Sequence, residues 1–381
     1  MYPLNVNIKL LLRLVRTIFL ALVILSVVAC DMNKEPIKIG YVGGLTGRVA
    51  GLGIAGRDGA LFAIEEVDRA GGIDGRQVSL VVKDDKQDAD TAKQAVRELI
   101  QEDVVAIVGH MTSSMSAETR PIINEAKKVM ISPTSKSDVL SGHDDYFFRV
   151  TAASSFNAQK VADLAYSQKG FKTFAVIYDM NNRAFTESWL QQFRQPYEAL
   201  GGKIIVTREF HSGSVNLSFL SLVKDVTTYK VDALLVLASA LDTALISQQL
   251  FKLGNQLPVF ASEWSFTSDL LNFGGMAVEG LTSFHSFNND NQNQRYLDYK
   301  DKFIKRFGYD PSFASVLSYD ATKLLLSAIQ RNSNPKQLKK TLLEMGPFPG
   351  LQSNIKFDQY GDVERSLFLT VINNGKFRVI D

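Results

Sequence analysis

Short apolar runs alternate with amphipathic stretches along most of the chain. Apolar runs at 37–43, 78–82, 104–108 and 129–132 have the character of buried parallel strands. Between and after them, apolar residues recur at helical spacing near 60–67, 95–100 and 116–128. This part of the chain therefore predicts strands and helices in strict alternation.

A second series of the same kind begins after about residue 152. Strands are predicted at 173–178, 203–208 and 232–238, and helices near 155–169, 185–200 and 241–253. Pro196 is expected to kink or break the second of these helices. Because alternating strands and helices favour parallel sheets covered on both faces, we predict an α/β protein with two doubly wound, Rossmann-like lobes.

The last hundred residues follow a different pattern. Two helices, near 293–307 and 313–331, come close together, and strands at 355–357 and 367–372 are predicted to flank a turn at 359–362. No low-complexity linker separates the two series. We therefore expect several segments to cross between the lobes.

The N-terminus predicts export. Lys9, Arg13 and Arg16 precede an apolar stretch at 18–28, which is shorter than the ~20 residues of a membrane-spanning helix. Val27-Val28-Ala29-Cys30 resembles a bacterial lipobox, in which the cysteine is lipidated and begins the mature protein. Residues 1–30 are thus predicted to be a lipoprotein signal peptide, with an uncleaved anchor as the alternative. Both interpretations place the rest of the chain outside the cytoplasm. A lipoprotein signal would also anchor it to the membrane by lipid.

Composition excludes several kinds of function. Cys30 is the only cysteine, and the net charge of +2 includes the three cations of the predicted signal, so neither disulfides nor nucleic-acid binding is expected. The four histidines lack metal-ligand spacing, and no Gly-x-Ser-x-Gly motif is present. Gly51-x-Gly53-x-x-Gly56 follows its strand too late for a dinucleotide fingerprint. We expect no metal, no cofactor and no catalysis.

Several short motifs together resemble a known family. They are Leu45–Gly53, Asp58-Gly-Ala60, Gly71–Gly75, Asp84-Asp85, Val108–Ser114, Ile131-Ser-Pro133, Tyr178-Asp179, Tyr319-Asp-Ala321 and Phe357–Asp362. In this order and spacing they resemble the type I periplasmic binding proteins of branched-chain amino acid ABC transporters, the leucine/isoleucine/valine-binding group.

The resemblance implies two lobes joined by three crossing segments. Lobe 1 is expected to hold 36–152 and 284–350, and lobe 2 to hold 153–283 and 351–381. It also implies a solute-binding protein that closes on an amino acid or a related ligand and docks on an ABC permease with its ATPase. A monomer is expected because no exposed apolar stripe stands out in the sequence. A receptor that signals to a membrane partner has the same fold and is the alternative.

The family places ligand contacts in loops that follow strands. Thr112, Ser113 and Ser114 begin a helix after a strand, where Ser113 best matches a carboxylate-binding serine, although helix capping also explains a serine there. Glu263 aligns with the family's ammonium-binding acid, with a surface acid as the alternative, and Trp264 would form an apolar wall. Ser239 matches a backbone contact of lobe 2, and Tyr178 and Phe185 would close over the ligand or pack in the core.

Lys136 departs from the family pattern. It follows Thr134 and Ser135, where relatives place a threonine that contacts both ends of the amino acid. One interpretation turns Lys136 to solvent and leaves Thr134 and Ser135 to bind; the other pairs Lys136 with a second carboxylate of a dicarboxylate or a bulkier acid. Leu52 stands where relatives often have an aromatic residue. The ligand's identity is therefore left open by the sequence.

Overall fold

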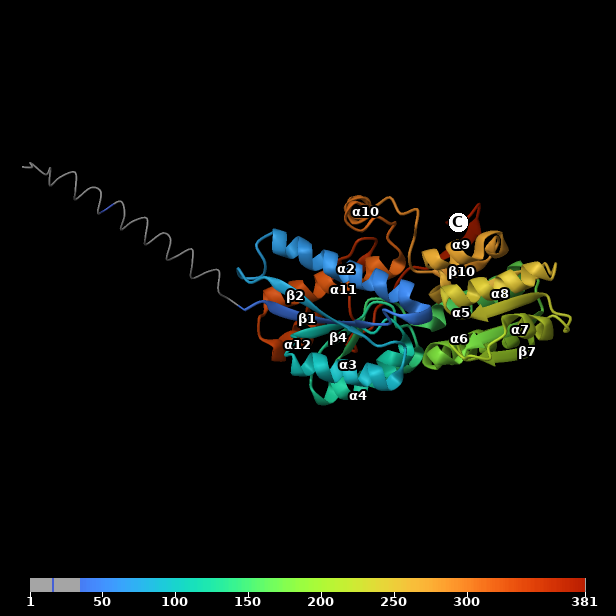
Figure 1. The fold of residues 1–381 in the computed structure, drawn as a ribbon, viewed down its shortest axis with the longest axis horizontal. Coiled ribbons are helices and arrows are strands. Elements are labelled where there is room, and N and C mark those ends of the chain that lie inside the picture. The colour runs from blue at the N-terminus through green and yellow to red at the C-terminus, as the bar shows by residue number, and fades with distance from the viewer. Residues whose placement is uncertain (1–15, 17–34, 381) are drawn as a thin grey trace, which may run out of the picture.

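The computed structural model describes residue 16 and residues 35–380. The predicted signal peptide and Cys30 lie outside the described residues, apart from Arg16. The described chain forms two α/β lobes side by side, each built on its own sheet (Figure 1). Within the described residues, no helix combines the length and apolar character that crossing a membrane requires.

The first lobe is built on a fully parallel five-stranded sheet. Its order is β2 (Val78–Asp84), β1 (Ile37–Gly43), β3 (Ala106–Gly109), β4 (Met130–Ser132) and β5 (Phe147–Arg149). Apolar side chains fill both faces of β1, where six of seven residues are buried. Helices therefore cover both faces, as continuous apolar strands require.

Among residues 35–380, six α-helices belong to the first lobe. They are α2 (Ala50–Arg69), α3 (Ala89–Gln101), α4 (Ser113–Glu125), α10 (Gln294–Phe307), α11 (Phe313–Arg331) and α12 (Leu338–Glu344). Tyr41 and Ile39 of β1 pack in one apolar cluster with α2 and α11, while Val42 packs in another with α3 and α4. The sheet thus separates two helical layers.

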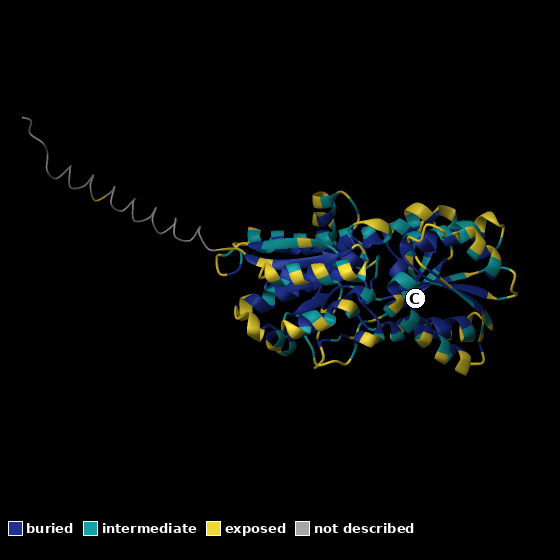
Figure 2. Ribbon diagram, turned by 60° about the horizontal axis from the view of Figure 1, so that its bottom comes forward, coloured by how far each residue is buried: buried dark blue, intermediate teal, exposed yellow. Residues whose placement is uncertain are grey.

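The second lobe is built on a seven-stranded mixed sheet. Its order is β14 (Lys376–Ile380), β13 (Phe368–Asn373), β10 (Thr282–His285), β9 (Val259–Ala261), β8 (Ala233–Leu237), β6 (Thr173–Asp179) and β7 (Lys203–Phe210). Only β13 runs antiparallel to its two neighbours. Its helices are α5 (Ser154–Asp163), α6 (Arg183–Ala199), α7 (Phe219–Val226), α8 (Ala240–Lys252) and α9 (Ser268–Gly274). Figure 2 shows buried strands inside and exposed outer helix faces.

The chain passes between the sheets three times: after β5, after β10 and before β13. Two expected boundaries need correction. All of β10 pairs in the second sheet, so the chain returns to lobe 1 after residue 285 rather than at 284. Residues 351–363 lie with lobe 1, because Phe357 packs on Phe148 at 5.1 Å between ring centroids and Arg149 N–H donates to Gly361 O.

One local prediction is wrong, and another needs a detail added. The strands expected at 355–357 and 367–372 are present near those positions and flank the turn, but β12 (Asn354–Ile355) pairs with β11 (Phe348–Pro349), and β13 joins the second sheet. Helix α6 continues through Pro196, which lies in its last turn. Pro196 lacks the N–H that would donate to the carbonyl of Gln192, and the helix ends three residues later, at Ala199.

The glycine series near the start of α2 serves close packing. A Cβ on Gly53 would lie 2.0 Å from Gly44 O, and one on Gly56 would lie 2.6 Å from the Tyr41 hydroxyl. Any side chain there would push α2 away from the loop after β1. The spacing that mimics a dinucleotide motif therefore has a packing explanation.

Candidate functional site

A small cavity lies between the lobes, where strand ends of the two sheets face each other. Its volume is about 20 Å³, room for about one water molecule. Lobe 1 supplies Met111, Thr112, Ser113, Thr134, Lys136 and Phe313, and lobe 2 supplies Asn182, Phe185, Glu263 and Trp264. Crevices at the carboxyl ends of parallel strands are the usual binding sites of α/β folds.

An ion pair spans this cavity from one lobe to the other. Lys136 Nζ lies 3.2 Å from Glu263 Oε1, and the two side chains are 5% and 2% exposed. The other carboxylate oxygen of Glu263 accepts a hydrogen bond from Trp189 Nε1 at 3.1 Å. Burial lowers the pKa of Lys136 from its ordinary value, and the Glu263 charge opposes that shift. The lobes are thus held closed by buried charges.

Backbone hydrogen bonds fix the loop that carries Lys136. Ser113 Oγ accepts from the N–H groups of Lys136 and Ser137, at 3.0 and 3.1 Å. Ser132 Oγ accepts from Ser135 N–H at 3.0 Å and donates to His110 O at 2.6 Å. The loop is therefore tied to the start of α4, whose N-terminus carries a partial positive charge.

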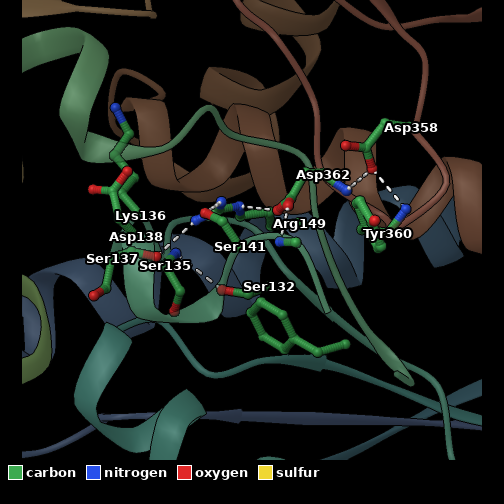
Figure 3. Close-up of polar contacts among 12 residues, drawn as sticks. Ser132, Ser135, Lys136, Ser137, Asp138, Ser141, Arg149, Asp358, Tyr360 and Asp362 are labelled. Atoms are coloured by element: carbon green, nitrogen blue, oxygen red, sulfur yellow. Dashed lines mark hydrogen bonds and ion pairs between the residues drawn. The ribbon is translucent and has the colours of Figure 1, made fainter. Parts of the chain in front are cut away.

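A buried arginine holds the same loop from behind (Figure 3). Arg149 donates to Ser137 O at 3.0 Å and to Asp362 Oδ1 at 2.7 Å, and it also contacts Ser141 Oγ. The Asp358 carboxylate accepts from the N–H of Asp362 at 2.9 Å and so shapes the turn that presents it. Arg149 thereby connects the Lys136 loop to a distant turn of lobe 1.

Further hydrogen bonds join the lobes beside the cavity. Ser114 N–H donates to Asn182 Oδ1 at 3.1 Å, and Ala184 N–H donates to Ser114 Oγ at 3.0 Å. Asp138 N–H donates to Ser188 Oγ at 3.2 Å. Because each bond crosses from lobe 1 to lobe 2, the structure is a closed form.

The remaining cavity wall is apolar and largely aromatic. Phe185 and Trp264 meet edge to face, with ring centroids 5.9 Å apart. Phe313 and Met111 contribute from lobe 1. A ligand at this site would place an apolar body here and its polar end toward Lys136 and the start of α4.

Comparison with known proteins agrees with this architecture. The sequence model of the periplasmic binding protein family matches residues 36–376. The chain belongs to this family. Its members are solute-binding proteins of the type I fold and not enzymes, which confirms the predicted family and fold class.

Individual family members are similar over nearly the whole chain. A leucine-, isoleucine-, valine-, threonine- and alanine-binding protein of Pseudomonas aeruginosa is 25% identical over 91% of this chain and 92% of its own length. Among solved structures, a branched-chain amino acid transporter substrate-binding protein of Streptococcus pneumoniae with isoleucine has a TM-score of 0.82, at 24% identity over 91% of this chain and 99% of its own. An ABC transporter solute-binding protein of R. palustris with benzoate has a TM-score of 0.81. It is 19% identical and covers 91% of this chain and 95% of its own.

In this periplasmic binding protein, six of the ten residues expected at the ligand line the cavity. They are Thr112, Ser113, Thr134, Lys136, Phe185 and Glu263. Lys136 points into the cavity rather than to solvent, and Glu263 is buried rather than a surface acid. Thr112 directly precedes α4 as its N-cap residue, but its side chain caps no backbone N–H there.

The other four expected residues are absent from the cavity wall. Ser114 joins the lobes beside it, and Ser135 Oγ contacts Ser116 Oγ at 2.8 Å inside lobe 1. Ser239 caps α8, accepting from Asp242 N–H and donating to its carboxylate. The Tyr178 hydroxyl donates to Glu209 at 3.1 Å. These side chains join the lobes, cap a helix or contact a side chain of their own lobe.

Sequence reasoning missed Asn182, Met111 and Phe313 as cavity residues. Asn182 precedes α6 directly, the kind of strand-to-helix junction that supplied Thr112, so the same reasoning would have found it. Phe313 begins α11, which lies far from the cavity loops in the sequence. No sequence pattern indicates that contact, because only the return of the chain to lobe 1 creates it.

Proposed function

We propose that this protein is the solute-binding lipoprotein of an ABC importer and that it traps an amino acid or amino acid-like ligand between its lobes. The observation that carries the proposal is the closed interlobe cavity, where Lys136, Glu263 and the start of α4 face an aromatic wall. Charged groups at one side and aromatic rings at the other suit a small ligand with one ionised end. The isoleucine and benzoate held by two structural neighbours are both ligands of this kind.

Binding proceeds by hinge closure. A cavity of about 20 Å³ is too small for an amino acid, so the lobes separate and the Lys136–Glu263 pair opens before a ligand enters. The ligand then favours the closed form to the extent that it binds that form more tightly. Three chain crossings between the lobes supply the hinge.

A thermal-denaturation screen tests the binding part of the proposal. The full chain, purified in detergent, is heated with amino acids, dicarboxylates, aromatic acids or amides. A ligand present at 100 times its Kd stabilises the folded form by about 2.7 kcal/mol and raises Tm. Phe185→Ala should reduce that shift, and Tyr178→Phe, away from the cavity, should not. A panel without any shift would contradict the proposal.

Two further experiments test transport and anchoring. Cells that lack this protein should lose uptake of the radiolabelled ligand identified in the screen, and unchanged uptake would rule out the importer role. The wild type should incorporate radiolabelled palmitate and Cys30→Ser should not, since the lipid would be attached at Cys30. Absence of label in the wild type, or equal labelling of the two proteins, would rule out the lipid anchor at Cys30.

A further inference from the structure

The two charges that line the interlobe cavity form an ion pair without a hydrogen bond. Lys136 Nζ and Glu263 Oε1 lie 3.2 Å apart, and both atoms are buried without a hydrogen-bond partner among the described residues. An ammonium group carries three N–H donors, and a carboxylate oxygen has lone pairs to accept them. Since buried polar groups of folded proteins are almost always hydrogen-bonded, both residues have bonding capacity left for a ligand.

The two charges belong to different lobes, so a ligand in the cavity lies between them. Lys136 follows β4 of lobe 1, and Glu263 follows β9 of lobe 2. A cavity of about 20 Å³ has no room for a ligand beside the intact pair. Entry of a ligand therefore separates Lys136 from Glu263. Each charge then needs a new counterion, because an unpaired buried charge is costly.

The hydrogen-bond donors of the cavity gather around Lys136 and the start of α4. Ser113 Oγ accepts from two backbone N–H groups, so its own hydrogen is free to be donated to a ligand. Asn182 Oδ1 accepts from Ser114 N–H, and the amide donors of Asn182 have no acceptor among the described residues. Both side chains line the cavity together with Lys136. Three donor side chains and a helix N-terminus thus suit the carboxylate of a ligand.

Glu263 supplies the acceptor for a positive charge. Among the described residues of the cavity wall it is the only acid. Its Oε2 accepts from Trp189 Nε1 at 3.1 Å, which fixes the carboxylate and leaves Oε1 for a ligand once Lys136 has moved away. Large apolar side chains line much of the remaining wall: Met111, Phe185, Trp264 and Phe313. Both charged groups of a ligand therefore lie at one end, and an apolar side chain extends from them.

We propose that Lys136 binds the carboxylate of the ligand, and that the Lys136–Glu263 pair is exchanged on binding for the carboxylate and the ammonium group of one apolar α-amino acid. The site then selects the free amino acid over its amide, which lacks the carboxylate, and over the corresponding acid without an amino group. This inference rests on the proposed function and narrows its ligand class. Lys136 is the residue that makes a free carboxylate necessary.

Ligands that differ by one charged group test this requirement. Isothermal titration calorimetry on the full chain in detergent, at about pH 6 where the amino groups are charged, compares leucine with leucinamide and 4-methylpentanoate, and phenylalanine with phenylalaninamide and 3-phenylpropanoate. At least one of the two amino acids should bind. It should bind at least about thirtyfold more tightly than its amide and its acid without an amino group, since a buried charge left unpaired costs that much.

The other outcomes separate the inference from the proposed function. An amide or an acid without an amino group that binds as tightly as its amino acid overturns the inference and leaves the proposed function intact. The same holds if neither amino acid binds while another ligand of the thermal panel does. Silence across the whole thermal panel and both ligand series overturns the proposed function, and the inference with it.

Two single variants and their combination assign the two charges. Lys136→Met should reduce the preference for the amino acid over its amide at least about tenfold and keep its preference over the acid without an amino group. Glu263→Gln should do the reverse. The double variant leaves no unpaired buried charge, so it should fold even where a single variant does not, and it should lose both preferences.

A surface lysine provides the matched control for these variants. Lys305→Met removes an exposed ion pair with Asp301 and should leave both preferences unchanged. A wild-type preference over the amide in Lys136→Met, or a double variant that still prefers the amino acid as the wild type does, would overturn the inference.

Discussion

Arg48 of lobe 1 donates a hydrogen bond from Nε to Asp242 Oδ1 of lobe 2 at 2.7 Å, and its Nη2 contacts the same oxygen. The Asp242 side chain is fully buried and that of Arg48 is 28% exposed. Neither residue lines the interlobe cavity. The pair therefore favours the closed form without touching the ligand.

Arg48→Gln is expected to shift the protein toward an open form. Asp242 would lose its cation on closure and regain water on opening, so ligand affinity should fall by roughly five- to thirtyfold, or about 1–2 kcal/mol. Calorimetry gives the affinity, and small-angle X-ray scattering should show a larger radius of gyration without ligand. Arg208→Gln, whose Asp225 partner lies in the same lobe, is the control. Equal scattering from the variant and the wild type would contradict this role.

Arg149→Met is expected to destabilise the fold. Arg149 is buried and paired with Asp362, so its loss leaves that carboxylate without its cation and frees the 137–141 loop (Figure 3). The free energy of unfolding should fall by about 2–4 kcal/mol, measured by chemical denaturation. Lys339→Met is the control. It removes the ion pair with Asp144, whose side chain is exposed, and should change the free energy of unfolding little. An equal loss of unfolding free energy in the two variants would show that Arg149 contributes no more to stability than an exposed ion pair does.

Asp320 should make stability depend on pH. Burial raises the pKa of Asp320 to about 6, and its Oδ1 accepts from Leu351 N–H at 2.9 Å. The folded protein thus holds this proton more tightly than the unfolded chain, so this group's contribution to stability falls as pH rises from about 4 to about 6 and stays low above that. Asp320→Asn removes the effect, and its advantage over wild type should grow from near zero at about pH 4 to about 3 kcal/mol above about pH 7. If the unfolding free energies of Asp320→Asn and the wild type depend on pH in the same way, Asp320 is not the source of this pH dependence.

Tryptophan fluorescence should report closure. The chain has two tryptophans, and both contact the site: Trp189 donates to Glu263, and Trp264 lines the cavity. Opening would expose Trp264 to water, so ligand binding should shift emission to shorter wavelengths. The shift of emission on ligand binding should be mostly lost in Trp264→Phe and retained in Trp189→Phe. A full signal in Trp264→Phe would mean that its surroundings do not change on closure.

The sequence located the strand ends and therefore most of the cavity loops. Thr112, Lys136 and Glu263 each follow an apolar strand by a few residues, and the carboxyl ends of parallel strands meet at one edge of a sheet. Tyr178, expected to close over the ligand or pack in the core, does not line the cavity. It lies within β6 and reaches Glu209 of the neighbouring strand β7 instead of the cavity, and apolarity alone does not tell which way a strand residue points.

By itself, the sequence determined the α/β class, the two series of strands and helices, and the family, because apolar periodicity and short motifs are local properties of the chain. Only the tertiary structure decided that Lys136 meets Glu263, that Phe313 returns from a distant helix to the cavity, and that residues 351–363 belong to lobe 1. The first depends on how the two sheets are placed against each other, and the other two depend on how distant segments pack within lobe 1. Both are set by chain crossings and side-chain packing between segments far apart in sequence, which no local pattern records.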